Sequence, residues 1–140
     1  MPTNVVGSKA GPKHHLPMVK CVSKVIVHNT SGLSAGVPFF IMPKGGQITL
    51  CGCLIETVFN PATNNILTLG HGANLNELFD ASTSGSSIDE ATAGWYESAA
   101  AKALKFAADT EIKIKYVQSG TAATTGKALF VVQYVETDLY

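Results

Sequence analysis

The alternation of hydrophobic and polar residues is most regular near the end of the chain. In residues 111–117 (EIKIKYV), Ile112, Ile114 and Tyr116 alternate with polar neighbours, and this period of two predicts a half-buried β-strand. After a loop of Gly, Ser, Thr and Ala, residues 127–135 (KALFVVQYV) form an almost continuous apolar run. Such a run is typical of a strand covered on both faces, so the sequence predicts a cover from a second sheet or from another subunit.

Similar short apolar runs, separated by turn-forming residues, occur earlier in the chain. They predict strands over residues 19–28, 37–42, 47–59 and 66–69. The prolines at the ends of run 37–42 place it at a sheet edge or a strand start. Run 47–59 (QITLCGCLIETVF) is apolar or small on both faces, which predicts a central strand. Gly52 in its middle indicates a β-bulge or a close approach of another group to the backbone.

Strict alternation along run 47–59 predicts which residues share a face of the strand. One face then holds Thr49, Cys51, Cys53, Ile55 and Phe59, and the other holds Ile48, Leu50, Leu54 and Val58. The chain has three cysteines, the third being Cys21, and we expect small, buried, free thiols. A zinc site built from them is not supported, because no C-x-x-C spacing is present.

Residues 93–108 (AGWYESAAAKALKFAA) are ambiguous between helix and strand. The alanines favour a helix, but the apolar positions form no helical stripe, so the sequence favours a strand from about Ala103. The chain therefore has seven or eight predicted short strands. This number predicts an all-β fold: an antiparallel β-sandwich or jelly roll. This domain is expected to span residues 18–140. Residues 1–17, rich in Pro and Gly, are expected to form a flexible, extended N-terminal arm.

The composition points to protein–protein contact rather than to nucleic acid. Of 140 residues, 46% are hydrophobic and 14% are charged, against about 25% charged in an average protein. The chain has no arginine, the residue that most often reads bases and phosphates, and no apolar segment long enough to span a membrane. We therefore expect neither nucleic acid nor membrane as a partner.

Charge is unevenly distributed along the sequence. The first 55 residues contain five lysines and no acid, whereas all ten acids lie in the rest of the chain. The arm, with Lys9 and Lys13, is either a solvated basic segment or one that docks on an acidic partner such as a neighbouring copy.

No catalytic or metal-binding constellation is present in the sequence. The histidines are His14, His15, His28 and His71. His71 is the best candidate because glycines flank it, although the glycines also serve a turn. The paired acids Asp89–Glu90 and Asp109/Glu111 are expected to be solvated. With no phosphate loop or nucleophile elbow, we expect no enzyme activity and no cofactor.

The segment from residue 51 to residue 135 resembles small β-sandwich virion proteins of tailed bacteriophages. The resemblance is carried by LIETVFNPATNNILTLG and by ALKFAADTEIKIKYVQSGTAATTGKALFVVQYVE. It implies a structural decoration or cement protein, a homotrimeric jelly roll bound to the exterior of the phage head and assembled in the host cytoplasm. The implied partners are the major capsid protein and other copies of this chain, and no catalytic residues are implied.

Contact surfaces follow from this hypothesis. The expected assembly contacts are Lys9 and Lys13 of the arm and the last apolar strand, with Leu129, Val131 and Val135. The alternative is a receptor- or glycan-binding module of a head fibre or tail fibre, in which Trp95, Tyr96 and His71 would form an exposed cluster.

Overall fold

The computed structural model describes residues 18–61, 63–73, 75–81 and 85–136. These residues form strands β2 (Lys20–Val27), β3 (Val37–Met42), β4 (Gly46–Thr57), β5 (Asn64–Gly70), β6 (Gly94–Glu97), β7 (Thr110–Ser119) and β8 (Lys127–Glu136), with one 3-10 helix, η2 (Ala100–Ala103). The predicted arm, with Lys9, Lys13, His14 and His15, lies outside the described residues. Within these ranges, no helix has the length and apolar character that crossing a bilayer requires.

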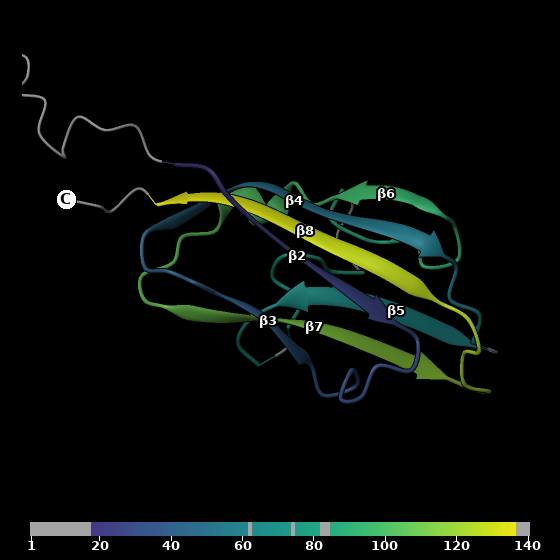
Figure 1. Ribbon diagram of the computed structural model, residues 1–140. Coiled ribbons are helices and arrows are strands. Elements are labelled where there is room, and N and C mark those ends of the chain that lie inside the picture. Colours follow the sequence, from purple (N-terminus) through teal and green to yellow (C-terminus); the bar gives the residue numbers. More distant parts are fainter. Residues whose placement is uncertain (1–17, 62, 74, 82–84, 137–140) are drawn as a thin grey trace, which may run out of the picture.

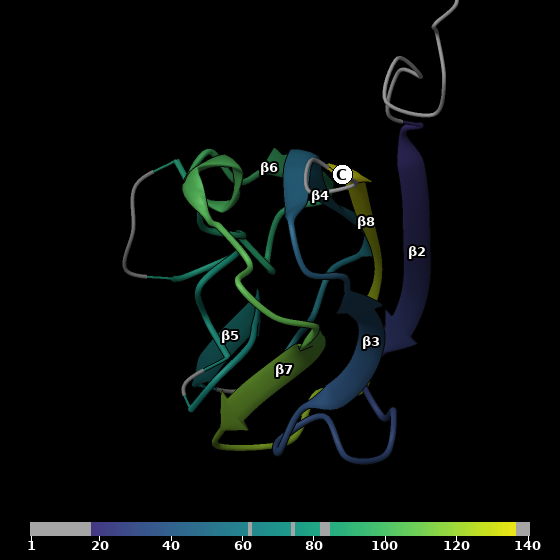
Figure 2. The same cartoon turned by 90° about the vertical axis from the view of Figure 1, so that its left-hand side faces the viewer.

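The strands form two sheets packed face to face (Figure 1). One sheet has four strands in the order β2-β8-β4-β6, and the other has three in the order β3-β7-β5, with every pairing antiparallel. Figure 2 shows β2 at the free edge of the first sheet, beyond β8. The predicted antiparallel β-sandwich is confirmed, as are the interior position of β4 and the edge position of β3. The jelly-roll arrangement stays a prediction.

The core lies between the sheets and follows from strand alternation. In β8, Ala128, Phe130, Val132 and Tyr134 are buried, whereas the residues between them are half-buried. The ring of Phe130 meets the ring of Phe79 edge-on at 6.2 Å between centroids. Burying each such side chain contributes about 1.5–3 kcal/mol to stability, so these inward residues anchor the sandwich.

The predicted assignment of residues to the two faces of β4 is wrong at the beginning of the strand. Ile48 is buried together with Cys51, Cys53 and Ile55, although strict alternation places Ile48 on the opposite face. The register with β8 shifts between Ile48 and Leu50, which is a bulge that inserts one extra residue. A bulge reverses the facing of every residue before it, so an unbroken period of two cannot describe this strand.

The predicted strand from Ala103 is also wrong. Ala103 ends η2, and the short strand β6 lies further back, at Gly94–Glu97. Serine side chains satisfy the first amide groups of the turn: Ser86 Oγ accepts from Ala100 N at 3.0 Å and Ser98 Oγ from Ala101 N at 3.3 Å. The first bond is tertiary and the second is local, and both favour a helical turn over an extended strand.

Candidate interaction face

A row of apolar side chains crosses the outer face of the four-stranded sheet. The pairing sets Val25 of β2 opposite Leu129 of β8, Leu129 opposite Leu54 of β4, and Leu54 opposite Trp95 of β6. We call these four residues the apolar row. Its ends, Val25 and Trp95, are 50% and 45% exposed, and the two leucines are half-buried. The described part of the chain therefore leaves this row uncovered.

The neighbouring row explains why these residues point outward. Ile26, Ala128 and Ile55 lie one position along the same three strands, pair with one another, and are buried in the core. Successive residues of a strand point to opposite faces. Filling the core with these three residues therefore places the apolar row on the outside.

Trp95 lies flat against the backbone of β4 at Gly52. A Cβ atom on Gly52 would fall 2.1 Å from Cζ2 of the indole, so only glycine permits this contact. The close approach that the sequence predicted at Gly52 is thus confirmed. The indole Nε1 donates to Glu97 Oε2 at 3.0 Å, which satisfies its polar atom while its ring stays partly in solvent.

Polar groups border the apolar row. Beside the middle of the row, Lys127 of β8 and Glu56 of β4 form an ion pair, with Nζ 3.2 Å from Oε1. At the β6 end, Glu97 holds the indole of Trp95. An apolar centre within a polar border is the usual anatomy of a protein–protein interface. The predicted contact residues Leu129, Val131 and Val135 occupy alternate positions of β8 on this face, and all three are half-buried.

The outer face of the three-stranded sheet has a different character. Along β7, Glu111, Lys113, Lys115 and Val117 alternate with the buried residues of the strand. Lys113 Nζ lies 3.6 Å from Glu111 Oε1, and 35% of the Lys113 side chain and 48% of the Glu111 side chain are exposed. This face is solvated, as the lysines in the sequence indicated.

The residues of the proposed glycan cluster do not come together. Trp95 points outward, whereas Tyr96, the next residue, packs against the core and donates its hydroxyl hydrogen to Thr92 O at 2.9 Å. The ring of His71 packs instead on the ring of Phe106, with centroids 5.7 Å apart. Of the three residues, only Trp95 presents an exposed aromatic ring.

The cysteines are free, but they differ in environment. Cys51 and Cys53 are buried on the same inward face, as predicted, whereas Cys21 is exposed, contrary to the prediction. Burial raises the pKa of the Cys51 thiol to about 12 and raises the pKa of Cys53 as well, so neither is a thiolate nucleophile at neutral pH. No three potential metal ligands gather anywhere in the described residues.

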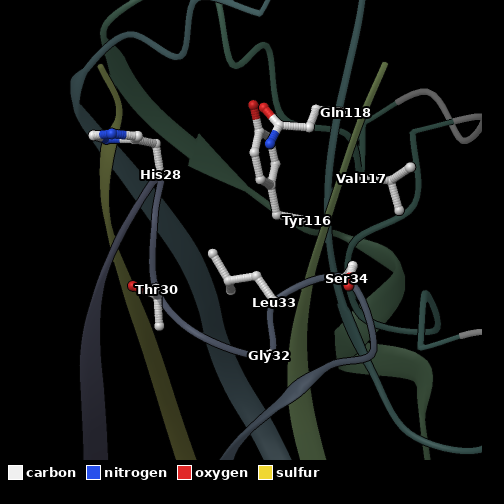
Figure 3. Close-up of a pocket in the computed structure, with 8 residues that line it drawn as sticks. All are labelled: His28, Thr30, Gly32, Leu33, Ser34, Tyr116, Val117 and Gln118. Carbon is white, nitrogen blue, oxygen red and sulfur yellow. The ribbon is translucent and has the colours of Figure 1, made fainter. Parts of the chain in front are cut away.

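A small pocket lies between the loop after β2 and the end of β7 (Figure 3). His28 and Ser34 stand on different sides of it (Figure 3). None of its lining residues is acidic, so no carboxylate orients a histidine base. The pocket therefore holds no nucleophile–base arrangement.

Comparison with known proteins gives a fold relationship. No protein-family model matches this chain, and neither does any curated protein sequence. A chain in the structure described as the acidic stable capsid of Helicobacter pylori bacteriophage KHP30 matches with a TM-score of 0.63 and 11% identity, over 86% of this chain and 90% of that one. A chain in the capsid asymmetric unit of cyanophage Pam1 matches with a TM-score of 0.62 and 16% identity, over 96% and 99%. This protein therefore shares its fold with chains found in two phage capsids.

Proposed function

We propose that this chain is a structural virion protein, a decoration or cement protein that binds and stabilises the exterior of a phage head. The observation that carries the proposal is the fold likeness to chains of two phage capsid structures, which extends over nearly the whole length of each. The uncovered apolar row and the low charge of the chain support it, because both suit a protein buried among others.

The mechanism is mechanical. The rigid sandwich bridges neighbouring major capsid subunits and other copies of this chain in a homotrimer. The outer face of β8 contacts them through Leu129, Val131 and Val135, and Lys9 and Lys13 of the arm attach to acidic surface on a neighbour. Each bridge adds binding free energy to the closed shell and so opposes expansion and dissociation.

The test uses purified particles that lack this protein, to which the full chain or a variant is added back. Full-length protein should bind and raise the temperature at which the particle opens. A chain lacking residues 1–17 should bind more weakly and protect less. If full-length protein neither binds nor protects the particles, the proposal is wrong; unchanged binding by the shortened chain refutes the role of the arm alone.

A receptor- or glycan-binding fibre module is the second candidate, and the exposure of Trp95 favours it. An indole face held in place by Glu97 can stack on a sugar ring. A glycan array separates the two functions. Binding to a sugar that is lost in Trp95→Ala supports the fibre module, and the absence of any bound glycan favours the cement protein.

A further inference from the structure

A cluster of buried polar groups surrounds Phe59 at one end of the sandwich. The Phe59 amide donates to the carbonyl oxygen of Glu90 at 3.0 Å, and the Asn65 side-chain amide donates to the carbonyl oxygen of Phe59 at 3.3 Å. The Phe59 ring packs on the ring of Tyr116, with centroids 4.8 Å apart. Phe59 therefore contacts three residues that come from three separate segments of the chain.

Each of these three residues buries a polar atom that finds no hydrogen-bond partner within residues 18–61, 63–73, 75–81 and 85–136. The atoms are Glu90 Oε2, Tyr116 Oη and Asn65 Oδ1. Glu90 is only 6% exposed and Tyr116 only 3%. The expectation that Asp89 and Glu90 are both solvated is thus wrong for Glu90, whereas Asp89 is exposed and its carboxylate accepts from Ala91 N at 3.1 Å. A buried carboxylate oxygen without a partner is costly in its charged form.

Among the residues that the structure describes, none offers Glu90 a positive charge. The titratable groups that act on it or respond to it are Cys53 of β4, Tyr96 of β6, Tyr116 of β7 and its own neighbour Asp89. Burial, reinforced by the charge of Asp89, raises the pKa of Glu90 to about 7, against hydrogen bonds from backbone amide groups that lower it. Loss of solvation is the dominant effect.

We propose that Glu90 is a proton-operated switch that tightens this end of the sandwich in acid and loosens it when the carboxyl group ionises. In acid Glu90 is a neutral carboxylic acid, which can stay buried at low cost. At higher pH the group carries a charge that has neither solvent nor cation beside it. The inference rests on the geometry around Phe59 and does not depend on the proposed function.

The loosening should concentrate where Phe59 is held. Beneath its ring lies Gly126, whose added Cβ would fall 2.3 Å from the ring. Next to it, the Asn60 side chain accepts from the amide groups of Thr124 and Thr125 at 2.9 and 2.8 Å. The β4–β5 and β7–β8 connections are therefore fastened together beside Glu90, and both should gain mobility when it ionises.

The sign of the pH dependence follows from linkage. Because the folded-state pKa of Glu90 is raised from 4.5 to about 7, the folded protein binds more protons than the unfolded chain between these values. The stabilising contribution is fully present below about pH 4.5 and is lost as the pH rises to about 7. Between a pH well below 4.5 and a pH well above 7, the unfolding equilibrium constant should increase roughly 300-fold through Glu90 alone.

The direct test is a carbon-13 NMR titration of the Glu90 carboxyl carbon in the full chain. A midpoint near pH 7 is expected, and a midpoint near pH 4.5 overturns the proposal. This measurement needs no variant, so its result can be interpreted even if a substitution of Glu90 disturbs folding.

Denaturant unfolding of two matched variants tests the consequence between pH 4.5 and pH 8. Glu90→Gln keeps the shape of the neutral acid and should remove most of the pH dependence and make the protein more stable than wild type at pH 8. Asp89→Asn, which removes the exposed neighbouring charge, should keep nearly the wild-type slope. Hydrogen exchange at the Phe59 amide, corrected for the intrinsic rate, should lose protection with rising pH in wild type and not in Glu90→Gln. A wild-type slope in Glu90→Gln refutes the switch.

Discussion

The two outer faces of the sandwich result from the same alternation of inward and outward residues, and yet they present different kinds of side chain. The three-stranded sheet presents the lysines and Glu111 of β7, whereas the four-stranded sheet presents the apolar row. Val117 and Val25 are exposed valines on these opposite faces, but Val117 pairs with the single apolar residue Ile66 and follows Lys115 on its face, whereas Val25 belongs to a row of four apolar residues. The comparison teaches that exposure alone does not mark an interface; continuity of apolar side chains across strands does.

This difference predicts that one side of the molecule faces water and that the other contacts protein. Charged side chains on β7 lose solvation if they are covered, so covering that face costs free energy. Covering the apolar row removes apolar surface from water and contributes about 25 cal/mol for each Å² buried. We therefore expect that partners meet the four-stranded sheet.

The largest expected effect comes from placing a charge in the apolar row. Val25→Glu should weaken binding to particles at least tenfold, which is about 1.4 kcal/mol, because the carboxylate loses its solvation in the contact. The measurement is a binding titration of purified variant against particles that lack the protein. Since Val25 is half exposed on an edge strand, the melting temperature should change by less than about 4 °C.

Val117→Glu is the matched control, since it places the same charge on an exposed valine of the other sheet. Its binding should equal that of wild type. Equal loss in both variants, or loss only in Val117→Glu, contradicts the assignment of the two faces.

A smaller effect is expected from Gly52→Ala, which displaces the indole without adding charge. The new methyl group takes the space of the Trp95 ring, so the ring should move outward. The apolar row should then lose the part of its surface that this ring provides on β6. Trp95 is the single tryptophan of the chain, so a red-shifted emission and stronger quenching by acrylamide report the movement directly. Particle binding should fall a few-fold, and unchanged emission would show that the ring does not rest on Gly52.

The smallest effect is expected on the solvated face. Glu111→Gln removes the exposed ion pair with Lys113 and should change the free energy of unfolding by less than about 0.5 kcal/mol. Chemical denaturation measures this, and particle binding should not change. A loss of more than about 1 kcal/mol would mean that the ion pair on this face stabilises the fold more than a solvated face should.

The sequence predicted the long strands and missed the features set by distant contacts. Strands β2, β3, β7 and β8 were located within a few residues because each has enough alternating or apolar positions to show a period. Strand β6 has only four residues, too few for a period, and the bulge after Ile48 depends on pairing with β8. Alternation predicts which face of its strand Leu129 occupies. Only the pairing register of β8 with β2 and β4 shows that Leu129 lies beside Val25 and Leu54.

The burial of Glu90 could not be predicted for a related reason. Next to Asp89 in the sequence it looks like half of a solvated pair, and only tertiary contacts, among them the hydrogen bond from the Phe59 amide to its carbonyl oxygen, remove it from water. The signal that was available was weak: Glu90 lies two residues after the apolar Ile88 and directly before Ala91. Burial of this kind is a property of the tertiary structure and not of the local sequence.

The most direct test of the central claim is an electron cryomicroscopy reconstruction of the particle at a resolution that separates the two sheets of this protein. The account predicts that the protein sits on the outside of the head, with the apolar row against the shell or against another copy. The outer face of β7 should point to solvent. A particle in which β7 lies in the contact and the apolar row faces solvent, or one that lacks the protein altogether, would contradict the account.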